Sequence, residues 1–411
     1  MIISWVFHLT LKKTNYKQMK KITQILLFTM IAASLFGAVK QDKKYLQWAI
    51  AVANSEMIHR PKLWQADFVA RPKWDYTQGL VAMSFLKLYA ETNNSAYFDY
   101  VHTFADFFVN ENGEIMTYKL SEYNIDRLNG GKFLFDMYHY TKYDKYLKAI
   151  KNLRAQLDTQ PRTDIGVFWH KKIYPYQVWL DGLYMGAPFY AQCAVEFDEP
   201  QASFDDIAKQ FVLADEVTLD AKTGLNFHAW DEQKMEKWAN KTTGHSPHFW
   251  GRAMGWYMMA VVDVLDCLPK NHPQRSQILD NFTRLTKSLI KWQDEKTGLW
   301  YQIINLPDRE GNYLETSCTA MFSYAIAKAV NKGYLPKKYR AVAEKAFNGI
   351  VNTMQHNAGG TVSITNACSV AGLGGNPYRS GTFEYYVSEP KRNDDPKVVG
   401  PFILAGIELS R

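Results

Sequence analysis

The sequence contains few cysteines, and they lie far apart. Only four occur in 411 residues, and no two of them form a CxxC pair. Zinc ribbons and thioredoxin-type redox sites need such pairs, so the spacing excludes both kinds of site. Cys193, Cys267 and Cys318 fall within helical patterns, and Cys368 falls in a predicted strand. We therefore expect four buried free thiols, with a disulfide bond as the alternative in an exported protein.

Several motifs that mark common enzyme classes are missing as well. No GxSxG nucleophile motif occurs, and the glycine-rich segment GLGGNP at 372–377 lacks the GK[ST] or GxGxxG ending of a phosphate loop. His245 and His248 are close in sequence, but a proline separates them and no third metal ligand is near. We expect a loop role for these histidines, and neither a metal nor an organic cofactor.

The first 38 residues have the composition of a secretory signal peptide. From Met19 the chain has a basic start, an apolar run of about fifteen residues, and small residues before a polar stretch. The apolar run is too short for a membrane-spanning helix, and no cysteine follows it, so we expect no membrane anchor. We predict that translation begins at Met19, that residues 1–38 are removed, and that the protein is exported to the periplasm or the medium.

The charge of the chain argues against a nucleic-acid partner. The formal net charge is +7, and five lysines belong to the predicted signal peptide. The remaining charge of about +2 is too small to attract a phosphate backbone. The twelve tryptophans and twenty-five tyrosines instead suit stacking on sugar rings. We expect a monomer or a small homo-oligomer.

Residues 39–411 predict a single all-α domain. No proline- or serine-rich linker interrupts them, and a series of segments shows the helical spacing of apolar residues. These segments are 42–59, 75–92, 95–110, 123–141, 143–157, 177–195, 202–218, 249–267, 273–293, 315–331, 336–355 and 399–409. Every second segment opens with small or polar residues and then becomes apolar, whereas the others, such as 143–157, are amphipathic.

Six helical hairpins with alternate helices buried are the pattern of an (α/α)6 barrel. Glycines recur near the starts of the apolar helices, at Gly79, Gly130, Gly182 and Gly251. Because glycine weakens a helix, this recurrence indicates that helix backbones approach closely there. The long connections become rim loops, and 298–306 and 359–368 predict short strands within them.

In such a barrel the N-termini of the inner helices meet at one end, so their positive dipole ends face a common funnel. The side chains expected there are Asp75, Asp126, Asp181, Arg252 and Glu315, with Trp74, Trp179, Trp250 and Trp256 as walls and His170 and His228 from rim loops. Carboxylates, imidazoles, indoles and an arginine together suit an acidic carbohydrate.

Most of these residues also have a purely structural interpretation. Asp75 and Asp126 could stabilise their helices as caps or first-turn acids. Arg252 could serve only to neutralise Asp181, and the histidines could be ordinary loop residues. Asp181 itself lies a turn into the apolar segment 177–195, where capping does not explain it. Since a buried unpaired carboxylate is costly, we predict a chemical role for Asp181.

Three segments carry a resemblance to a known family. HKKIYPYQVWLDGLYMGAPFYA at 170–191, NIDRLNGGK at 124–132 and HFWGRAMGWYMMAVVDVL at 248–265 resemble, in order and spacing, the unsaturated rhamnogalacturonyl hydrolases, family 105 of the glycoside hydrolases. The likeness extends from Trp48 to the C-terminus. It implies an (α/α)6 barrel that removes the 4,5-unsaturated galacturonyl residue from lyase-generated rhamnogalacturonan fragments by hydrating its double bond.

The resemblance also implies roles for individual residues. Asp181 is implied as the general acid/base and Asp126 as the second catalytic carboxylate. Substrate binding is implied for His170, Trp179, His228, Arg252 and Trp256, and we add Trp74 as a further wall. In an apolar setting Asp181 would hold its proton and donate it to C4 of the enol ether. No metal or cofactor is required.

One residue departs from the pattern of the family. Cys318 stands where a glycine is expected, and we predict that it narrows the floor of the cavity.

Other functions remain open at this point. The sister family of unsaturated glucuronyl hydrolases uses the same fold and chemistry on glycosaminoglycan fragments, and sulfated ulvan fragments are a further substrate of the resembling family. The WLDG and RxxGW signatures favour rhamnogalacturonan. A non-catalytic oligosaccharide-binding protein is the alternative of another class, but a binder has no need of Asp126 and Asp181 together.

Overall fold

The computed structural model describes residues 43–411, and the predicted signal peptide lies outside this range. A first helix is described over 43–59. It is followed by α2 (Tyr76–Thr92), α3 (Ser95–Phe108), α4 (Asp126–Asn129), α5 (Phe133–Thr141), α6 (Asp144–Thr159), α7 (Leu180–Glu196), α8 (Gln201–Thr218), α9 (Gly251–Val264), α10 (Arg275–Ile290), α11 (Thr316–Asn331), α12 (Arg340–Asn352), α13 (Phe383–Ser388) and α14 (Pro396–Leu409). Short 3-10 helices cover Leu63–Asp67, Leu120–Glu122 and Lys337–Tyr339.

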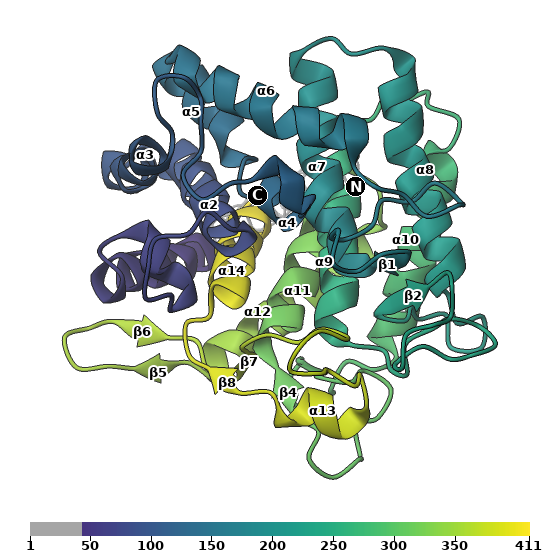
Figure 1. Cartoon of the computed structure of the whole chain (residues 1–411). Coiled ribbons are helices and arrows are strands. Elements are labelled where there is room, and N and C mark those ends of the chain that lie inside the picture. The colour runs from purple at the N-terminus through teal and green to yellow at the C-terminus, as the bar shows by residue number, and fades with distance from the viewer. Residues whose placement is uncertain (1–42) are drawn as a thin grey trace, which may run out of the picture.

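The inner helices form a closed ring. Helix α2 packs on α4 and α5, and α4 packs on α7; α7, α9, α11 and α14 then follow in order, and α14 packs back against α2. Figure 1 shows α7, α9, α11 and α14 side by side in the middle of the molecule, with α3 and α8 towards opposite edges. The fold is an all-α (α/α)6 barrel, as predicted.

Burial distinguishes the two rings of helices. Every residue of α14 is buried, since this inner helix is surrounded by other helices. The outer helix α6 buries only the stripe Tyr146, Ala149, Ile150, Leu153, Gln156 and Leu157, whose spacing of three and four residues defines one face. The apolar segments of the sequence therefore form the inner ring of helices, and the amphipathic segments form the outer ring.

The recurrent glycines mark places where inner helices touch. A Cβ atom added to Gly79 would lie 2.6 Å from Cα of Gly130, and one added to Gly251 would lie 2.9 Å from Sγ of Cys318. The predicted close approach is thus confirmed at both positions. Cys318 is fully buried against α9 and does not narrow the cavity floor as predicted. All four cysteines are free, and Cys267 is half-buried.

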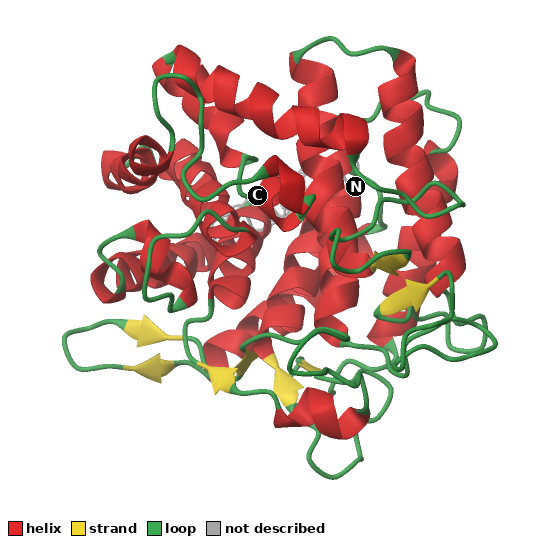
Figure 2. Ribbon diagram, in the orientation of Figure 1, coloured by secondary structure: helices red, strands yellow, loops and turns green. Residues whose placement is uncertain are grey.

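The strands are short and pair in twos, all antiparallel. They are β1 (Gln177–Trp179) with β2 (Ala229–Asp231), β3 (Trp300–Tyr301) with β4 (Leu314–Glu315), β5 (Gln355–His356) with β6 (Val362–Ser363), and β7 (Ala367–Cys368) with β8 (Lys391–Arg392). Strands β1 and β4 run directly into α7 and α11, so the strands collect at the end of the barrel where inner helices begin (Figure 2).

The structure differs from the helix predictions in three places. The segment 123–141 is not one helix, because residues 130–132 form a turn between α4 and α5. Residues 177–179 form β1 rather than the start of a helix, because they pair with β2, with Trp179 opposite Ala229. Helix α7 therefore begins at Leu180, and Asp181 lies in its first turn instead of a turn further in. The short helix α13 was not predicted. None of the helices within 43–411 has the length and apolar character needed to cross a bilayer.

Candidate active site

A cavity of about 300 Å³ lies at the end of the barrel where the inner helices begin. This volume is at the lower end of the roughly 300–1,000 Å³ usual for small-molecule sites. The residues that line it are Asp67, Lys73, Asp75, Tyr76, Asp126, His170, Lys171, Tyr174, Trp179, Asp181, Met185, Trp256, Ser369, Val370, Ala371, Arg379, Arg392 and Lys397. Of the predicted site residues, the cavity brings together both aspartates with His170, Trp179 and Trp256.

Asp126 is held between two cationic or ionisable groups. Nε2 of His170 lies 3.0 Å from Oδ1 of Asp126, and Nζ of Lys171 lies 2.5 Å from Oδ2. Backbone contacts bring these three residues together. Ile125 N donates a hydrogen bond to His170 O, and Asn124 and Lys171 form an isolated antiparallel β-bridge. Burial alone would raise the pKa of Asp126, but Lys171 and His170 overcome this effect and hold it well below its usual range. Asp126 is therefore ionised at neutral pH.

Asp181 has a different environment. Its Oδ2 atom lies 3.1 Å from Nε2 of His228, and among residues 43–411 no lysine or arginine forms an ion pair with it. His228 is fully buried, and its Nδ1 lies 2.6 Å from the hydroxyl of Tyr386. Leu180 N donates to His228 O, which fixes the rim loop against the first turn of α7. His228 thus contacts the predicted acid without lining the cavity itself.

Aromatic rings form one wall between the two aspartates. The Trp179 ring stacks on His170 at 5.1 Å and on Tyr174 at 5.0 Å between ring centroids. Its indole Nε1 donates to Gln177 Oε1 at 2.9 Å, which fixes the ring orientation. Because Trp179 ends β1 and Asp181 follows two residues later, this wall and the carboxylate are positioned by the same strand-to-helix junction.

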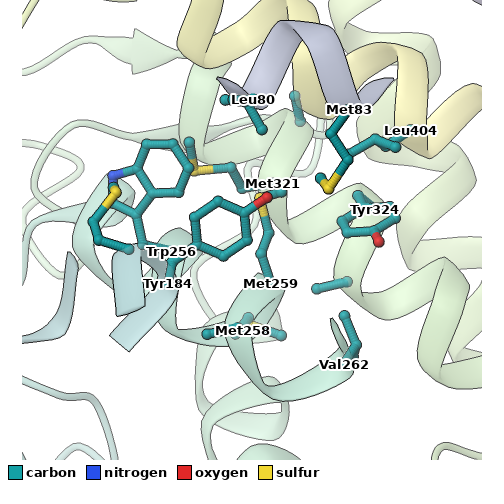
Figure 3. Close-up of a cluster of buried hydrophobic side chains, with 14 of the residues drawn as sticks. Leu80, Met83, Tyr184, Trp256, Met258, Met259, Val262, Met321, Tyr324 and Leu404 are labelled. Carbon is teal, nitrogen blue, oxygen red and sulfur yellow. The ribbon is translucent and has the colours of Figure 1, made fainter. Parts of the chain in front are cut away.

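Trp256 lines the cavity from α9 and rests on a buried apolar cluster. Its ring stacks on Tyr184 at 4.9 Å, and Tyr76 meets it edge-on at 6.1 Å. Figure 3 shows Trp256 and Tyr184 beside Met259 and Met321, with Leu80 and Leu404 contributed by other inner helices. This packing gives the cavity a rigid apolar floor.

Comparison with known proteins places the chain in a family. A family model described as Glycosyl Hydrolase Family 88 matches residues 48–411. A glycoside hydrolase of C. acetobutylicum from family 105 superposes with a TM-score of 0.85 and 44% identity, covering 88% of this chain and 99% of that one. The chain is a glycoside hydrolase of this 88/105 group. The resemblance to family 105 is confirmed.

Two curated relatives extend the comparison. Protein Atu3128 of Agrobacterium fabrum is 36% identical over 231 residues, which is 54% of this chain and 97% of that protein. The unsaturated rhamnogalacturonyl hydrolase YesR of Bacillus subtilis is 28% identical over 313 residues, which is 74% of this chain and 82% of YesR.

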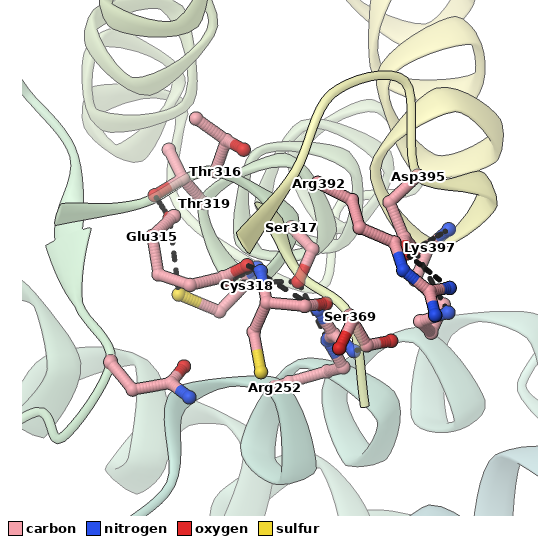
Figure 4. Close-up of polar contacts among 12 residues, drawn as sticks. Arg252, Glu315, Thr316, Ser317, Cys318, Thr319, Ser369, Arg392, Asp395 and Lys397 are labelled. Atoms are coloured by element: carbon pink, nitrogen blue, oxygen red, sulfur yellow. Dashed lines mark hydrogen bonds and ion pairs between the residues drawn. The ribbon is translucent and has the colours of Figure 1, made fainter. Parts of the chain in front are cut away.

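In this glycoside hydrolase Arg252 is not part of the cavity lining. It is fully buried, donates from Nε to Ser317 Oγ at 2.7 Å, and pairs with Glu315 at 3.4 Å. It also donates to the backbone carbonyls of Cys368 and Ser369 (Figure 4). Arg252 therefore holds the rim segment that includes Ser369, and the direct contact with substrate expected from the resemblance is not seen in its placement.

Glu315 is the partner that fixes this network. It begins α11 as the N-cap residue, and its Oε2 accepts hydrogen bonds from Cys318 N at 2.7 Å and Ser317 Oγ at 2.9 Å. Its Oε1 accepts from Cys368 N at 2.8 Å. Because the side chain has no exposed surface, Glu315 acts in the structure of the rim and not in the cavity.

Two further predictions concern α2 and the loop before it. Trp74, predicted as a wall of the site, is fully buried and stacks on Phe104 at 5.9 Å, and its Nε1 donates to Arg127 O. It belongs to the core. Asp75 caps α2 by accepting from Tyr76 N and pairs with Lys73 at 2.6 Å, so the capping interpretation is confirmed, although Asp75 also lines the cavity.

The sequence interpretation missed twelve of the residues that line the cavity, and three of them matter most for the site. Lys171 follows His170 directly, and the HKK segment carried the signal that a cation lies beside the predicted imidazole. Tyr174 lies in the same segment. Arg379 gave no such signal, because it lies about 200 residues further along and only the fold brings it to Trp179. Within residues 43–411 no cluster of three or more His, Cys, Asp or Glu side chains is placed to hold a metal ion.

Proposed function

We propose that this glycoside hydrolase removes the 4,5-unsaturated galacturonyl residue from lyase-generated rhamnogalacturonan oligosaccharides by hydrating the C4=C5 double bond. The observation that carries the proposal is the contrast between two carboxylates of one cavity. Asp126 is kept ionised by Lys171 and His170, whereas among residues 43–411 Asp181 forms an ion pair with His228 and with no lysine or arginine. Acid-catalysed hydration needs one group that donates a proton and a second, negatively charged group that stabilises the positive charge, and we assign these roles to Asp181 and Asp126.

In the proposed reaction Asp181 donates its proton to C4 of the enol ether, and positive charge develops at C5 and the ring oxygen. The Asp126 carboxylate, which lines the same cavity, stabilises this charge. Water then adds to C5 and gives its proton to the carboxylate left on Asp181, which restores the acid. The resulting hemiketal opens and releases the sugar to which it was linked. The net reaction consumes one water molecule.

The choice of the rhamnogalacturonyl substrate has separate support. It rests on the WLDG and RxxGW segments and on the similarity to YesR, whose name describes that activity. The acidic substrate also suits the cations in the cavity wall, which include Lys73, Lys171 and Arg379.

The test follows the ultraviolet absorbance of the conjugated enol ether. The protein is mixed with rhamnogalacturonan fragments cut by a lyase, and sugar release is measured in parallel. We expect absorbance to fall at the rate at which the sugar is released. Release without loss of absorbance would indicate displacement at the anomeric carbon, and no change with any unsaturated disaccharide would overturn the proposed activity.

Two further substrates decide the specificity. Unsaturated chondroitin and ulvan disaccharides are assayed under the same conditions. A higher kcat/KM on the rhamnogalacturonan fragment supports the proposed substrate, and a higher value on either alternative assigns the enzyme to that substrate instead.

A further inference from the structure

We propose that Arg379 binds the carboxylate of the unsaturated uronide and is the residue that selects acidic over neutral substrates. The inference rests on the proposed function for the identity of the uronide. It concerns a residue far in sequence from the segments that define the catalytic aspartates, and it follows from how the cavity cations are partnered.

Five cationic side chains line the cavity, and four of them already have a carboxylate partner. The ion pairs are Lys73 with Asp75 at 2.6 Å, Lys171 with Asp126 at 2.5 Å, Lys397 with Asp395 at 2.9 Å, and Arg392 with Asp67 at 3.6 Å. Figure 4 shows Arg392 and Lys397 close to Asp395. Among residues 43–411 no carboxylate pairs with Arg379, so its charge is available to an anion in the cavity.

The hydrogen bonds of Arg379 leave one end of the guanidinium free. Nε donates to Gly374 O at 2.9 Å, and Nη2 donates to Leu373 O at 2.9 Å and to the Tyr174 hydroxyl at 2.7 Å. A guanidinium has five N–H groups, and these three bonds use those of Nε and Nη2. The two N–H groups of Nη1 have no acceptor among the described residues, while the other three bonds fix the plane of the group.

The neighbouring backbone is built to admit this arginine. A Cβ atom added to Gly372 would lie 2.2 Å from Nη1 of Arg379, so a side chain at position 372 would push the guanidinium out of its present place. Gly374 and Arg379 exchange backbone hydrogen bonds at 2.9 and 3.1 Å, which closes the loop between them. The glycine-rich segment at 372–377, which has no phosphate-loop signature, therefore serves to seat a guanidinium.

Arg379 also lies against the aromatic wall of the site. Its Cζ atom is 5.8 Å from the ring centroids of both Tyr174 and Trp179. Trp179 in turn stacks on His170, which contacts Asp126. The guanidinium of Arg379 is thus linked through these packed rings to Asp126, one of the two catalytic carboxylates. The guanidinium of Arg252, in contrast, already pairs with Glu315 and donates to the rim carbonyls.

The experiment compares the unsaturated disaccharide with its methyl ester, in which the carboxylate charge is absent. Binding of both is measured by calorimetry in Asp181→Asn, which we expect to turn them over too slowly to disturb the measurement, and again in Asp181→Asn/Arg379→Gln. We expect roughly 10- to 100-fold tighter binding of the acid than of the ester, and loss of this preference when Arg379 is replaced. Arg379→Lys, which keeps the charge without the planar fork, should retain part of the preference. Arg309→Gln, an exposed arginine outside the cavity, is the matched control.

The outcomes separate this inference from the proposed function. Equal weakening of acid and ester in Arg379→Gln would mean a structural role in the loop and would overturn the inference, as would an unchanged preference. If the Asp181→Asn chain prefers the acid through Arg379 but the unsubstituted enzyme turns over no unsaturated uronide, the inference stands and the proposed function fails. If the unsubstituted enzyme turns over the unsaturated uronide but binding shows no preference for the acid, the proposed function stands and the inference about Arg379 fails.

Discussion

Lys171 and Asp126 form an ion pair of 2.5 Å in the wall of the cavity. The pair matters for the pH dependence of the enzyme, because Lys171 and His170 outweigh the effect of burial and hold the pKa of Asp126 well below its usual range. A carboxyl with a lowered pKa stays ionised until the pH falls through that low value. In the unsubstituted enzyme Asp126 therefore keeps its charge in mildly acidic solution.

Replacing Lys171 by methionine should change this behaviour. Without the ammonium group the pKa of Asp126 rises, by about 1–3 units for loss of an adjacent opposite charge, so protonation begins at higher pH. We expect the acidic limb of the kcat/KM profile to move to higher pH in Lys171→Met. Lys172→Met, which changes the exposed neighbouring lysine, should leave the limb in place. Identical profiles for all three proteins would contradict the role given to Lys171.

The second prediction concerns the proposed acid. Asp181→Asn should reduce turnover by about 10²- to 10⁴-fold, since an amide cannot donate the proton. Its midpoint of thermal unfolding should stay close to that of the unsubstituted enzyme, because Asp181 forms no ion pair with lysine or arginine among the described residues. Near-normal turnover by Asp181→Asn would refute the assignment.

Asp75→Asn is the matched comparison, since Asp75 is an aspartate at the start of another inner helix. Its carboxylate pairs with Lys73 and Arg127, so the substitution should lower stability by about 1 kcal/mol while most activity remains. If Asp75→Asn lost as much activity as Asp181→Asn, the loss would follow from replacing any aspartate at the start of an inner helix and would not identify Asp181 as the acid.

The third prediction concerns Arg252 as a structural residue of the rim. Arg252→Met removes the ion-pair partner of the fully buried Glu315, and breaking a buried pair in this way typically costs about 3–5 kcal/mol. We expect a large fall in the free energy of unfolding, measured by urea denaturation. Arg309→Met removes an exposed ion pair with Glu384 and should leave the free energy of unfolding nearly unchanged. Similar losses in the two variants would contradict the buried role.

The fourth prediction concerns Lys132, an amine buried between inner helices. Its Nζ atom lies 3.4 Å from the centroid of the Tyr184 ring and has no hydrogen-bond partner among the described residues. Burial lowers the pKa of Lys132 to about 7. Between about pH 7 and 10 the unfolded chain therefore holds a proton that the folded chain lacks, so this lysine makes stability rise with pH in that window.

Lys132→Met should remove this effect. We expect the variant to gain about 1–3 kcal/mol of unfolding free energy at pH 7 and less at pH 9, because the free energy needed to remove the proton from Lys132 on folding falls as the pH rises from 7 towards 10. Urea denaturation at the two pH values measures the difference. Lys87→Met, an exposed lysine paired with Asp136, is the control and should shift both values equally. A parallel shift in Lys132→Met would refute the prediction.

Much of the fold could be read from the chain because helices follow local periodicity. The alternation of apolar and amphipathic segments predicted the two rings, and the recurrent glycines predicted where backbones touch, as Gly79 and Gly130 confirm. The start of α7 was predicted wrongly, because the pairing of β1 with β2 involves residues about 50 positions apart and outweighs the local helical pattern.

Some features of the site could likewise be predicted from the sequence, and others could not. The amino-acid sequence by itself determined the barrel, the pair Asp126 and Asp181, and the imidazole at His170, because these residues belong to short segments whose spacing survives folding. Only the tertiary structure decided that Trp74 is core, that Arg252 is neutralised by Glu315, and that Arg379 lines the cavity with no carboxylate partner in the described part of the chain. Whether a charged side chain has an ion-pair partner depends on residues that lie far away in the chain. A short segment of sequence does not show which of these residues folding brings close to it.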